Sequence, residues 1–402
     1  MPNFKYEVVD AAGRSSKGII EAATIGDASK MLRADGRYIA SLEQDSGSSI
    51  LSMNIGSPKL KTKDLMIITR QLSSLLSAGI TVIRSLDMLY QQLESKKAKA
   101  CIGSVYESIQ AGKTLSEAFR DQAKALPPIM VSMISAGEES GRLDEVMNRL
   151  AMHFEKEQKM KNKVAAAMVY PIILAVVTLG ITVGLMTLIV PRFAQTLNDL
   201  GGELPGLTKA VMSFSNSLVN YWYVYIAVIL GVVVGFRLFV HSEKGSMAWA
   251  KFTLKVPVVG KANKATAAAR FTRTMATLLR SGISVLDSME ITSHTLGNKW
   301  LESQLFESRN EIRKGSSVSR SIRGIKEFPP MIYAMTAIGE ESGSLDSILD
   351  KAADFFEDEA DAATAKMTAA MEPLMIVVMA GVVLLIVGAC GLPILTMTKS
   401  IM

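Results

Sequence analysis

Two recurring clusters of carboxylates are the residues of this chain best suited to chemistry. They consist of Glu138, Glu139 and Asp144, and of Glu340, Glu341 and Asp346. Grouped carboxylates can bind a hard cation such as Ca²⁺, but a calcium site needs roughly six to eight oxygen ligands at dense spacing. Each cluster is sparser than that, so cation binding stays an open alternative. We predict instead that the aspartates favour the start of a following helix, while the glutamates face water or a partner protein.

A short motif near the first cluster resembles the end of a phosphate-binding P-loop. Gly112-Lys113-Thr114 supplies the glycine, lysine and hydroxyl that such a loop places around a phosphate. The loop also needs an earlier glycine at the position that Glu107 occupies, and a preceding strand that the helical pattern does not provide. The motif is better explained as a helix break followed by the capping box Thr114-Leu115-Ser116-Glu117.

The other residues with catalytic potential lack partners at useful spacing. The three histidines, His153, His241 and His294, are far apart and have no metal-ligand spacing. No Gly-x-Ser-x-Gly nucleophile motif occurs. The first and third long apolar runs contain no Asp, Glu, Lys, Arg or His, which argues against an ion-coupled transporter. The sequence therefore predicts a protein that is not an enzyme, with no catalytic residue, no metal and no cofactor.

The chain carries the same unit twice, and this duplication positions the carboxylates. Thr69–Val82 returns as Thr272–Val285, and Pro127–Asp144 returns as Pro329–Asp346. The offset is 203 residues for the first pair (272 − 69) and 202 for the second (329 − 127), so one residue has been lost between them. Apolar residues recur at three- and four-residue steps in these segments, which predicts a bundle of amphipathic helices in each copy.

Recurring glycines and prolines are expected to shape the backbone of each copy. They are Gly79, Gly141, Pro171, Gly282, Gly343 and Pro373. Gly79 and its counterpart interrupt a helix, whereas Gly141 and its counterpart are expected to end one in the left-handed conformation. Each proline marks the beginning of a long apolar run.

Three uncharged runs are long enough to cross a bilayer. They lie between Lys163 and Arg192, between Lys209 and Arg237, and between Glu372 and Lys399. Each exceeds the roughly 20 apolar residues that a transmembrane helix needs. Basic residues gather before the first run and after the second, which predicts that both large domains are cytoplasmic. The net charge of +6 is then explained by these membrane flanks rather than by nucleic-acid binding.

The pattern predicts a mostly α-helical integral membrane protein with two homologous cytoplasmic helical-bundle domains. A small N-terminal α+β unit is expected at 1–45, with a short helix at 27–35, and a Gly/Ser-containing linker follows at 46–60. The remaining expected parts are a first bundle at 61–168, a transmembrane helix at 169–191, a short outer loop at 192–218, a second transmembrane helix at 219–240, a second bundle at 263–371 and a third transmembrane helix at 372–396.

The doubled motif carries a resemblance to a known family. Each copy contains Pro-Pro, then Gly-Glu-Glu-Ser-Gly-x-Leu-Asp, then an apolar run that starts at a proline. Together with Phe4-x-Tyr6 and Gly13 near the N-terminus, these features cover the whole chain. The chain resembles the inner-membrane platform proteins of type IV pilus machines and type II secretion systems, the protein F family. The copies differ beside the matched prolines, where Tyr170 stands in one and Glu372 in the other.

The resemblance implies a non-enzymatic inner-membrane protein at the base of a filament-assembly machine. Such a protein would couple a cytoplasmic hexameric assembly ATPase to the insertion of pilin or pseudopilin subunits into the growing fibre. The implied partners are this ATPase, those subunits, other inner-membrane assembly proteins, membrane lipid and further copies of the chain, and not nucleic acid.

The six carboxylates are the predicted docking residues, because an ATPase that binds and releases repeatedly needs a polar, salt-sensitive contact. The alternative is a membrane-anchored signalling or scaffold protein unrelated to filament assembly. Such a receptor would need an outer sensing domain, and the expected outer loop at 192–218 is too short to fold as one.

Overall fold

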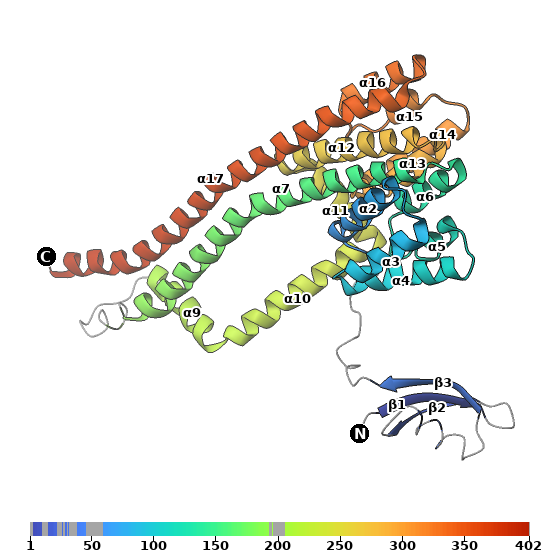
Figure 1. Cartoon of the computed structure of the whole chain (residues 1–402). Helices are drawn as coiled ribbons and strands as arrows, with labels where there is room; N and C mark the ends of the chain where they lie inside the picture. The colour runs from blue at the N-terminus through green and yellow to red at the C-terminus, as the bar shows by residue number, and fades with distance from the viewer. Residues whose placement is uncertain are drawn as a thin grey trace. The chain divides into compact units, whose positions relative to one another are not determined.

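The computed structural model describes the backbone of residues 3–9, 15–21, 38–45, 59–192 and 206–401, and a few single residues besides. Residues 1–58 and 59–402 form two compact units. Strands occur in the first unit, whereas the described part of the second is helical (Figure 1).

A three-stranded antiparallel sheet makes up most of what is described in the first unit. Its strands are β1 (Asn3–Val9), β2 (Ser15–Glu21) and β3 (Tyr38–Asp45), in the order β2-β1-β3. Tyr6 at the centre of β1 pairs with Gly18 on one side and with Leu42 on the other. The short helix expected at 27–35 and the linker expected at 46–60 lie almost entirely outside the described residues.

Six helices build the first repeat within the described range 59–192. They are α2 (Thr62–Ser77), α3 (Val82–Gln92), α4 (Lys96–Gln110), α5 (Leu115–Asp121), α6 (Pro128–Ser140) and α7 (Leu143–Gly184). Leu65, Ile68 and Leu72 share one face of α2 and are buried, as expected of an amphipathic helix. The capping box predicted at the start of α5 is confirmed, because Thr114 and Glu117 each bind the other's backbone amide.

The second repeat has the same order of helices in the range 259–401. They are α12 (Val259–Arg280), α13 (Val285–Ser293), α14 (Lys299–Arg313), α15 (Val318–Ile322), α16 (Pro330–Glu341) and α17 (Leu345–Ile401). A further helix, α11 (Glu243–Lys255), precedes them.

Each repeat has its own hydrophobic core, and the core of the first repeat also takes in residues of the second. Leu278 of α12 and Ile291 of α13 belong to the same buried cluster as Leu150 and Phe154 of α7. The guanidinium of Arg149 in α7 also donates a hydrogen bond to the backbone carbonyl at the end of α12. The repeats therefore form a single structural body.

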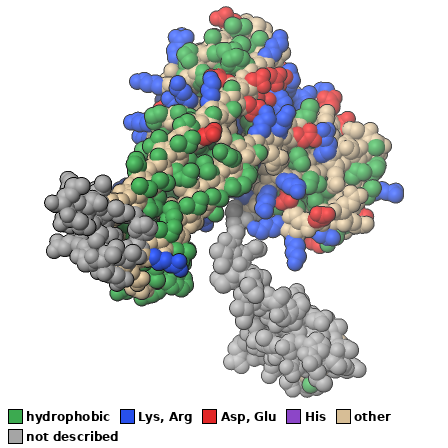
Figure 2. Space-filling model, turned by 90° about the vertical axis from the view of Figure 1, so that its left-hand side faces the viewer, with side chains coloured by type: hydrophobic (Ala, Val, Ile, Leu, Met, Phe, Trp, Pro, Cys, Tyr) green, Lys and Arg blue, Asp and Glu red, His purple; other side chains and the backbone are tan. Residues whose placement is uncertain are grey.

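Helices α7 and α17 each continue from this body into an apolar segment without a break. α7 passes through Pro171 and is extended by a π-helical turn, η1 (Leu185–Ile189), while α17 passes through Pro373. With α10 (Trp222–His241), they are the three described helices that are long and apolar enough to cross a membrane. Figure 1 shows α7 and α17 running side by side, and Figure 2 shows few charged side chains over their apolar segments.

The outer loop expected at 192–218 needs correction, because its second part is the helix α9 (Gly206–Asn220). The Ser215 hydroxyl donates to the Met186 carbonyl oxygen at 2.5 Å, and the Thr208 hydroxyl donates to the Ala389 carbonyl oxygen at 2.6 Å. A π-helical turn disturbs the regular bonding of a helix, so a hydroxyl that reaches Met186 helps to satisfy its carbonyl in an apolar setting. Helix α9 therefore packs against both long helices.

The recurring glycines all have positive φ angles. The values are 79° at Gly79, 69° at Gly141, 80° at Gly282 and 64° at Gly343. This left-handed region is open to glycine but strained for residues that carry a Cβ atom. At Gly141 it lets α6 end and α7 start after a very short turn.

Replacing Gly141 with valine should destabilise the junction of α6 and α7 by about 1–2 kcal/mol, because valine adopts this backbone only with strain. A Cβ atom at Gly141 would meet no heavy atom within 4 Å, so a clash adds nothing to the effect. Hydrogen exchange of the full-length protein in detergent should become faster on both sides of the turn. Gly141→Asn is the control, since asparagine tolerates this region. Unchanged exchange in Gly141→Val would contradict a conformational role.

Candidate functional site

Glu138, the first glutamate of the first cluster, binds the backbone at the start of α5. Its Oε1 accepts the Leu115 amide hydrogen at 2.7 Å, and its Oε2 accepts the Ser116 amide hydrogen at 2.8 Å. Backbone amides in the first turn of a helix lack helical partners, and the helix dipole favours an anion there. A carboxylate from the end of α6 therefore caps the N-terminus of α5.

Glu340 makes the same contact in the second repeat. Its carboxylate accepts the amide hydrogens of Val318 at 2.5 Å and Ser319 at 2.8 Å, at the start of α15. The first glutamate of the doubled motif thus has a structural task in both copies. The expectation that both glutamates of each motif face water or a partner is wrong for Glu138 and Glu340, which are half-buried and bonded within the chain.

These bonds also act on the ionisation of Glu138. Burial would raise the pKa of this carboxyl, but hydrogen bonding by Ser116 and the Leu115 amide outweighs it and lowers the pKa below its ordinary value. The carboxylate is therefore charged at neutral pH, which is the state that an N-terminal cap requires.

Three of the predicted docking residues remain exposed: Glu139, Asp144 and Glu341. Glu139 accepts a hydrogen bond only from Ser135 of its own helix, at 3.2 Å. Asp346 is engaged, since its carboxylate lies 3.7 Å from Arg280 Nε. Among the described residues, no group of three or more His, Cys, Asp or Glu side chains could hold a metal ion. The exposed carboxylates stay candidates for a protein partner.

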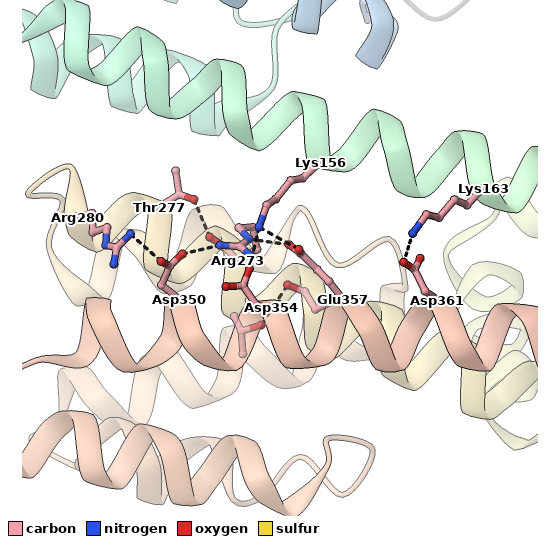
Figure 3. Close-up of polar contacts among 11 residues, drawn as sticks. Lys156, Lys163, Arg273, Thr277, Arg280, Asp350, Asp354, Glu357 and Asp361 are labelled. Atoms are coloured by element: carbon pink, nitrogen blue, oxygen red, sulfur yellow. Dashed lines mark hydrogen bonds and ion pairs between the residues drawn. The ribbon is translucent and has the colours of Figure 1, made fainter.

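A second polar site, which the sequence reasoning missed, lies between α12 and α17. Arg273 of α12 contacts three carboxylates on one face of α17 (Figure 3). Its Nη1 lies 2.5 Å from Asp350 Oδ1, its Nε lies 2.6 Å from Glu357 Oε1, and its Nη2 pairs with Asp354. The Arg273 side chain is only 11% exposed, so these partners must offset the desolvation of its charge.

Lys156 of α7 brings the first repeat into this site. Its Nζ lies 2.9 Å from Asp354 Oδ1 and 3.1 Å from Glu357 Oε2. Arg273, Lys156 and the three carboxylates are called the Arg273 cluster below. Farther toward the membrane, Lys163 of α7 pairs with Asp361 of α17, so the charged pairs form a row between the two helices (Figure 3).

The charges of the Arg273 cluster hold one another ionised. The hydrogen bond from Lys156 lowers the pKa of Asp354, and Arg273 adds to this effect while burial opposes it. Burial would lower the pKa of Arg273, but hydrogen bonds and the negative charges of its partners raise it instead. Asp354 and Glu357 each contact a cation from both repeats, which makes the cluster a direct link between them.

Matched positions show why this cluster joins the repeats instead of recurring in each. Arg70 and Glu155 correspond to Arg273 and Glu357, and they form a simple pair at 2.6 Å in the first repeat. The matched positions that differ are Asn148 against Asp350, Met152 against Asp354, and Lys159 against Asp361. Helix α17 is therefore acidic where α7 is neutral or basic. A position-by-position comparison of the two copies could have revealed this signal.

A cavity of about 500 Å³ lies beside the Arg273 cluster, between the two repeats. His153 and Arg270 line it, and the Nδ1 atom of His153 and the Nε atom of Arg270 are buried without a hydrogen-bond partner among the described residues. Burial lowers the pKa of His153, so the imidazole is neutral in the folded protein. The contact between the repeats thus contains a histidine whose protonated form is unfavourable in the folded protein.

Comparison with known proteins agrees with the two repeats. Residues 68–191 and 271–393 each match the family described as Type II secretion system (T2SS), protein F, and residues 1–43 match the N-terminal domain of that family. The chain belongs to this family. The two long matches run from the bundles into the apolar segments of α7 and α17, so the duplicated unit of the family includes a membrane-spanning part.

Relatives of the chain are named for two kinds of machine. A type IV pilus assembly protein PilC of Thermus thermophilus is 36% identical over 98% of this chain and 97% of its own length. A type II secretion system protein F of Pseudomonas aeruginosa is 31% identical over 99% of both chains. A type IV pilus assembly protein TapC of Aeromonas hydrophila is 30% identical over 97% of this chain and 94% of its own.

Glu138→Gln should loosen the start of α5 by about 1 kcal/mol, the usual scale for a lost helix cap. The amides of Leu115 and Ser116 should then exchange with solvent about fivefold faster in the full-length protein, since 1.4 kcal/mol corresponds to about tenfold. Glu139→Gln is the matched control, because this neighbouring carboxylate is exposed and binds no backbone amide in the described structure. Equal exchange in the two variants would show that Glu138 is not a cap.

Stability should fall as the pH drops below about 6.5, the ordinary pKa of an unfolded histidine. Burial lowers the pKa of His153 in the folded state. Its contribution to the free energy of unfolding is therefore complete above about pH 6.5 and is lost as the pH falls toward the pKa of the folded state. Glu157 and Glu357 oppose this shift, whereas Arg270 and Arg273 support it.

The melting temperature of His153→Gln should therefore change less between about pH 7 and pH 5 than that of the unmodified protein. His241→Gln, at the exposed end of α10, serves as the control and should keep the full pH dependence. The same pH dependence in His153→Gln as in the unmodified protein would contradict the assignment to His153.

Proposed function

We propose that this protein is the inner-membrane assembly platform of a type IV pilus or type II secretion machine. In this role it couples a cytoplasmic assembly ATPase to the insertion of pilin or pseudopilin subunits into the growing fibre. Membership of the protein F family and the names of the relatives support the choice of machine. The observation that carries the mechanism is the unbroken passage of α7 and α17 from the bundles into the apolar segments.

A continuous helix can carry a displacement from one end to the other. At 1.5 Å per residue, the 42 residues of α7 extend over roughly 60 Å. The Arg273 cluster and the Lys163–Asp361 pair join α7 to α17 before the apolar segments begin. A movement imposed on the bundles would therefore reach the bilayer through both helices together.

The packing of the two repeats against each other supports a cytoplasmic position for both. Because Leu278 and Ile291 pack with the core of the first repeat, the two repeats must lie on the same side of the membrane. One span leaves this side and a second returns to it, as α7 and α10 do. Lysines near the inner ends of these spans favour the cytoplasm as that side.

The exposed carboxylates beside the turns from α6 to α7 and from α16 to α17 are the proposed docking residues for the ATPase. This end of the bundles lies farthest along each helix from its apolar segment. The contact would be polar, as a repeatedly released partner requires. Glu139 and Glu341 are the clearest candidates, because both are exposed while their neighbours Glu138 and Glu340 serve as caps.

The double variant Glu139→Lys with Glu341→Lys should reduce co-purification of the assembly ATPase of the same organism at least severalfold at low salt, with a weaker effect at higher salt, because salt screens the charges. The control is Glu94→Lys with Glu307→Lys, which changes the charge equally at two other exposed positions. Circular dichroism should show that both variants are folded. Full ATPase binding by folded Glu139→Lys with Glu341→Lys would place the docking surface elsewhere.

A further inference from the structure

A groove with a surplus of lysines lies between the start of α12, the loop before α16 and the membrane-proximal part of α17. Its volume is about 750 Å³. The lysines that line it are Lys255, Lys261, Lys264, Lys326 and Lys366. None of their ammonium groups has a hydrogen bond or an ion pair with another described residue. Such a concentration of unpaired cations favours an anionic ligand.

Few carboxylates are available to neutralise this groove. Glu327 and Glu359 are the acidic residues in its described lining. Glu327 already accepts a hydrogen bond from the indole N–H of Trp300 at 3.0 Å. The contrast with Lys156 and Lys163 is direct, because each of those lysines has a carboxylate partner on α17. The lysines of the groove are left for a partner outside the chain.

The groove lies next to the membrane. Lys366 on α17 precedes Pro373, where the apolar segment begins, by seven residues (373 − 366), which is roughly 10 Å along a helix. On the opposite side, α11 follows directly from the inner end of α10 and leads to Lys255. Both walls of the groove are thus attached to spans.

Helix α11 has the side chains of a helix that rests at a membrane surface. The ring of Trp249 lies 5.0 Å from that of Phe236 in the span α10, and it stacks on Phe252 at 5.6 Å. Trp249 and Phe252 are 38% and 57% exposed. Tryptophan favours the membrane–water interface, and lysines beside exposed aromatic rings are typical of interfacial helices.

The backbone around the groove is closely fixed. A Cβ atom at Gly245 would lie 1.9 Å from the Phe239 carbonyl oxygen, so only glycine lets α11 fold back on α10 at this point. The turn between α11 and α12 holds Val258 at φ 67° and ψ −58°, with the next amide bonded to the Pro257 carbonyl oxygen at 2.8 Å. This γ-turn is a strained conformation for valine, and strain of this kind accompanies functional sites.

We propose that the groove binds the phosphate-containing head group of an anionic phospholipid, with the lipid chains beside the aromatic rings of α11. Lysine ammonium groups bind phosphate as flexible point charges and attract anionic head groups at a membrane surface. A lipid fits better than a soluble phosphate compound, because exposed aromatic rings and two spans adjoin the same groove. This assignment does not depend on ATPase docking.

The test is native mass spectrometry of the full-length protein in detergent, titrated with phosphatidylglycerol or with phosphatidylcholine. The first phosphatidylglycerol should bind at least about tenfold more tightly than phosphatidylcholine. This preference should be lost in the variant Lys261→Gln, Lys264→Gln and Lys366→Gln. The control variant is Arg84→Gln, Arg313→Gln and Lys314→Gln, which removes equal charge at exposed sites near the opposite end of the bundles. The control should keep the preference.

A phosphatidylglycerol preference that survives in a folded groove variant would overturn the proposal, and so would an equal loss in both variants. A further arm adds glycerol 3-phosphate at the same concentration as the lipid. If this soluble compound displaces phosphatidylglycerol from the first site at comparable concentration, the groove serves a soluble phosphate and the lipid assignment is wrong. Failure of the compound to compete supports the lipid.

Discussion

The charge of Arg273 can be buried against the acidic face of α17 only because carboxylates on that face neutralise it. Asp350, Asp354 and Glu357 occupy this face, and Arg273 lies among them almost out of contact with water. Burying a charge without partners costs several kcal/mol, and removing one member of a buried ion pair leaves that cost uncompensated. Because one cation comes from α12 and another, Lys156, from α7, satisfying this face fixes the two repeats against each other.

Much of the remaining architecture depends on this link. The repeats pack against each other, so the chain must cross the membrane and return between them, which α7 and α10 accomplish. Two of the three helices that hold the Arg273 cluster, α7 and α17, continue toward the bilayer, so their apolar segments leave the body close together. Helix α9 then bonds to both of these segments through Ser215 and Thr208. Contacts thus join α7 and α17 at two places along their length, at the Arg273 cluster and at α9.

Features set by neighbouring residues could be predicted from the sequence, whereas features set by distant ones could not. The capping box at Thr114 and the helix breaks at the recurring glycines depend on a few adjacent residues, and the spans depend on composition alone. The role of Glu138 depends on amides more than 20 residues away, so exposure was expected where a cap exists. Arg273 meets partners about 80 residues along the chain, and only the helical packing brings them together. Helix α9 was not predicted because its packing depends on distant residues: the hydroxyls of Thr208 and Ser215 bond to carbonyl groups of α17 and η1.

The central claim is that the Arg273 cluster holds α7 and α17 together, and a distance distribution tests it most directly. Spin labels can be attached to the full-length protein at Lys159→Cys on α7 and Asp358→Cys on α17, both exposed positions. Burial raises the pKa of the native Cys101 thiol to about 11, which keeps it unreactive, and Cys390 can be replaced by alanine. Pulsed electron paramagnetic resonance should give one narrow distribution for the otherwise unmodified protein and a much broader one for Arg273→Gln. An equally narrow distribution in folded Arg273→Gln would contradict the account.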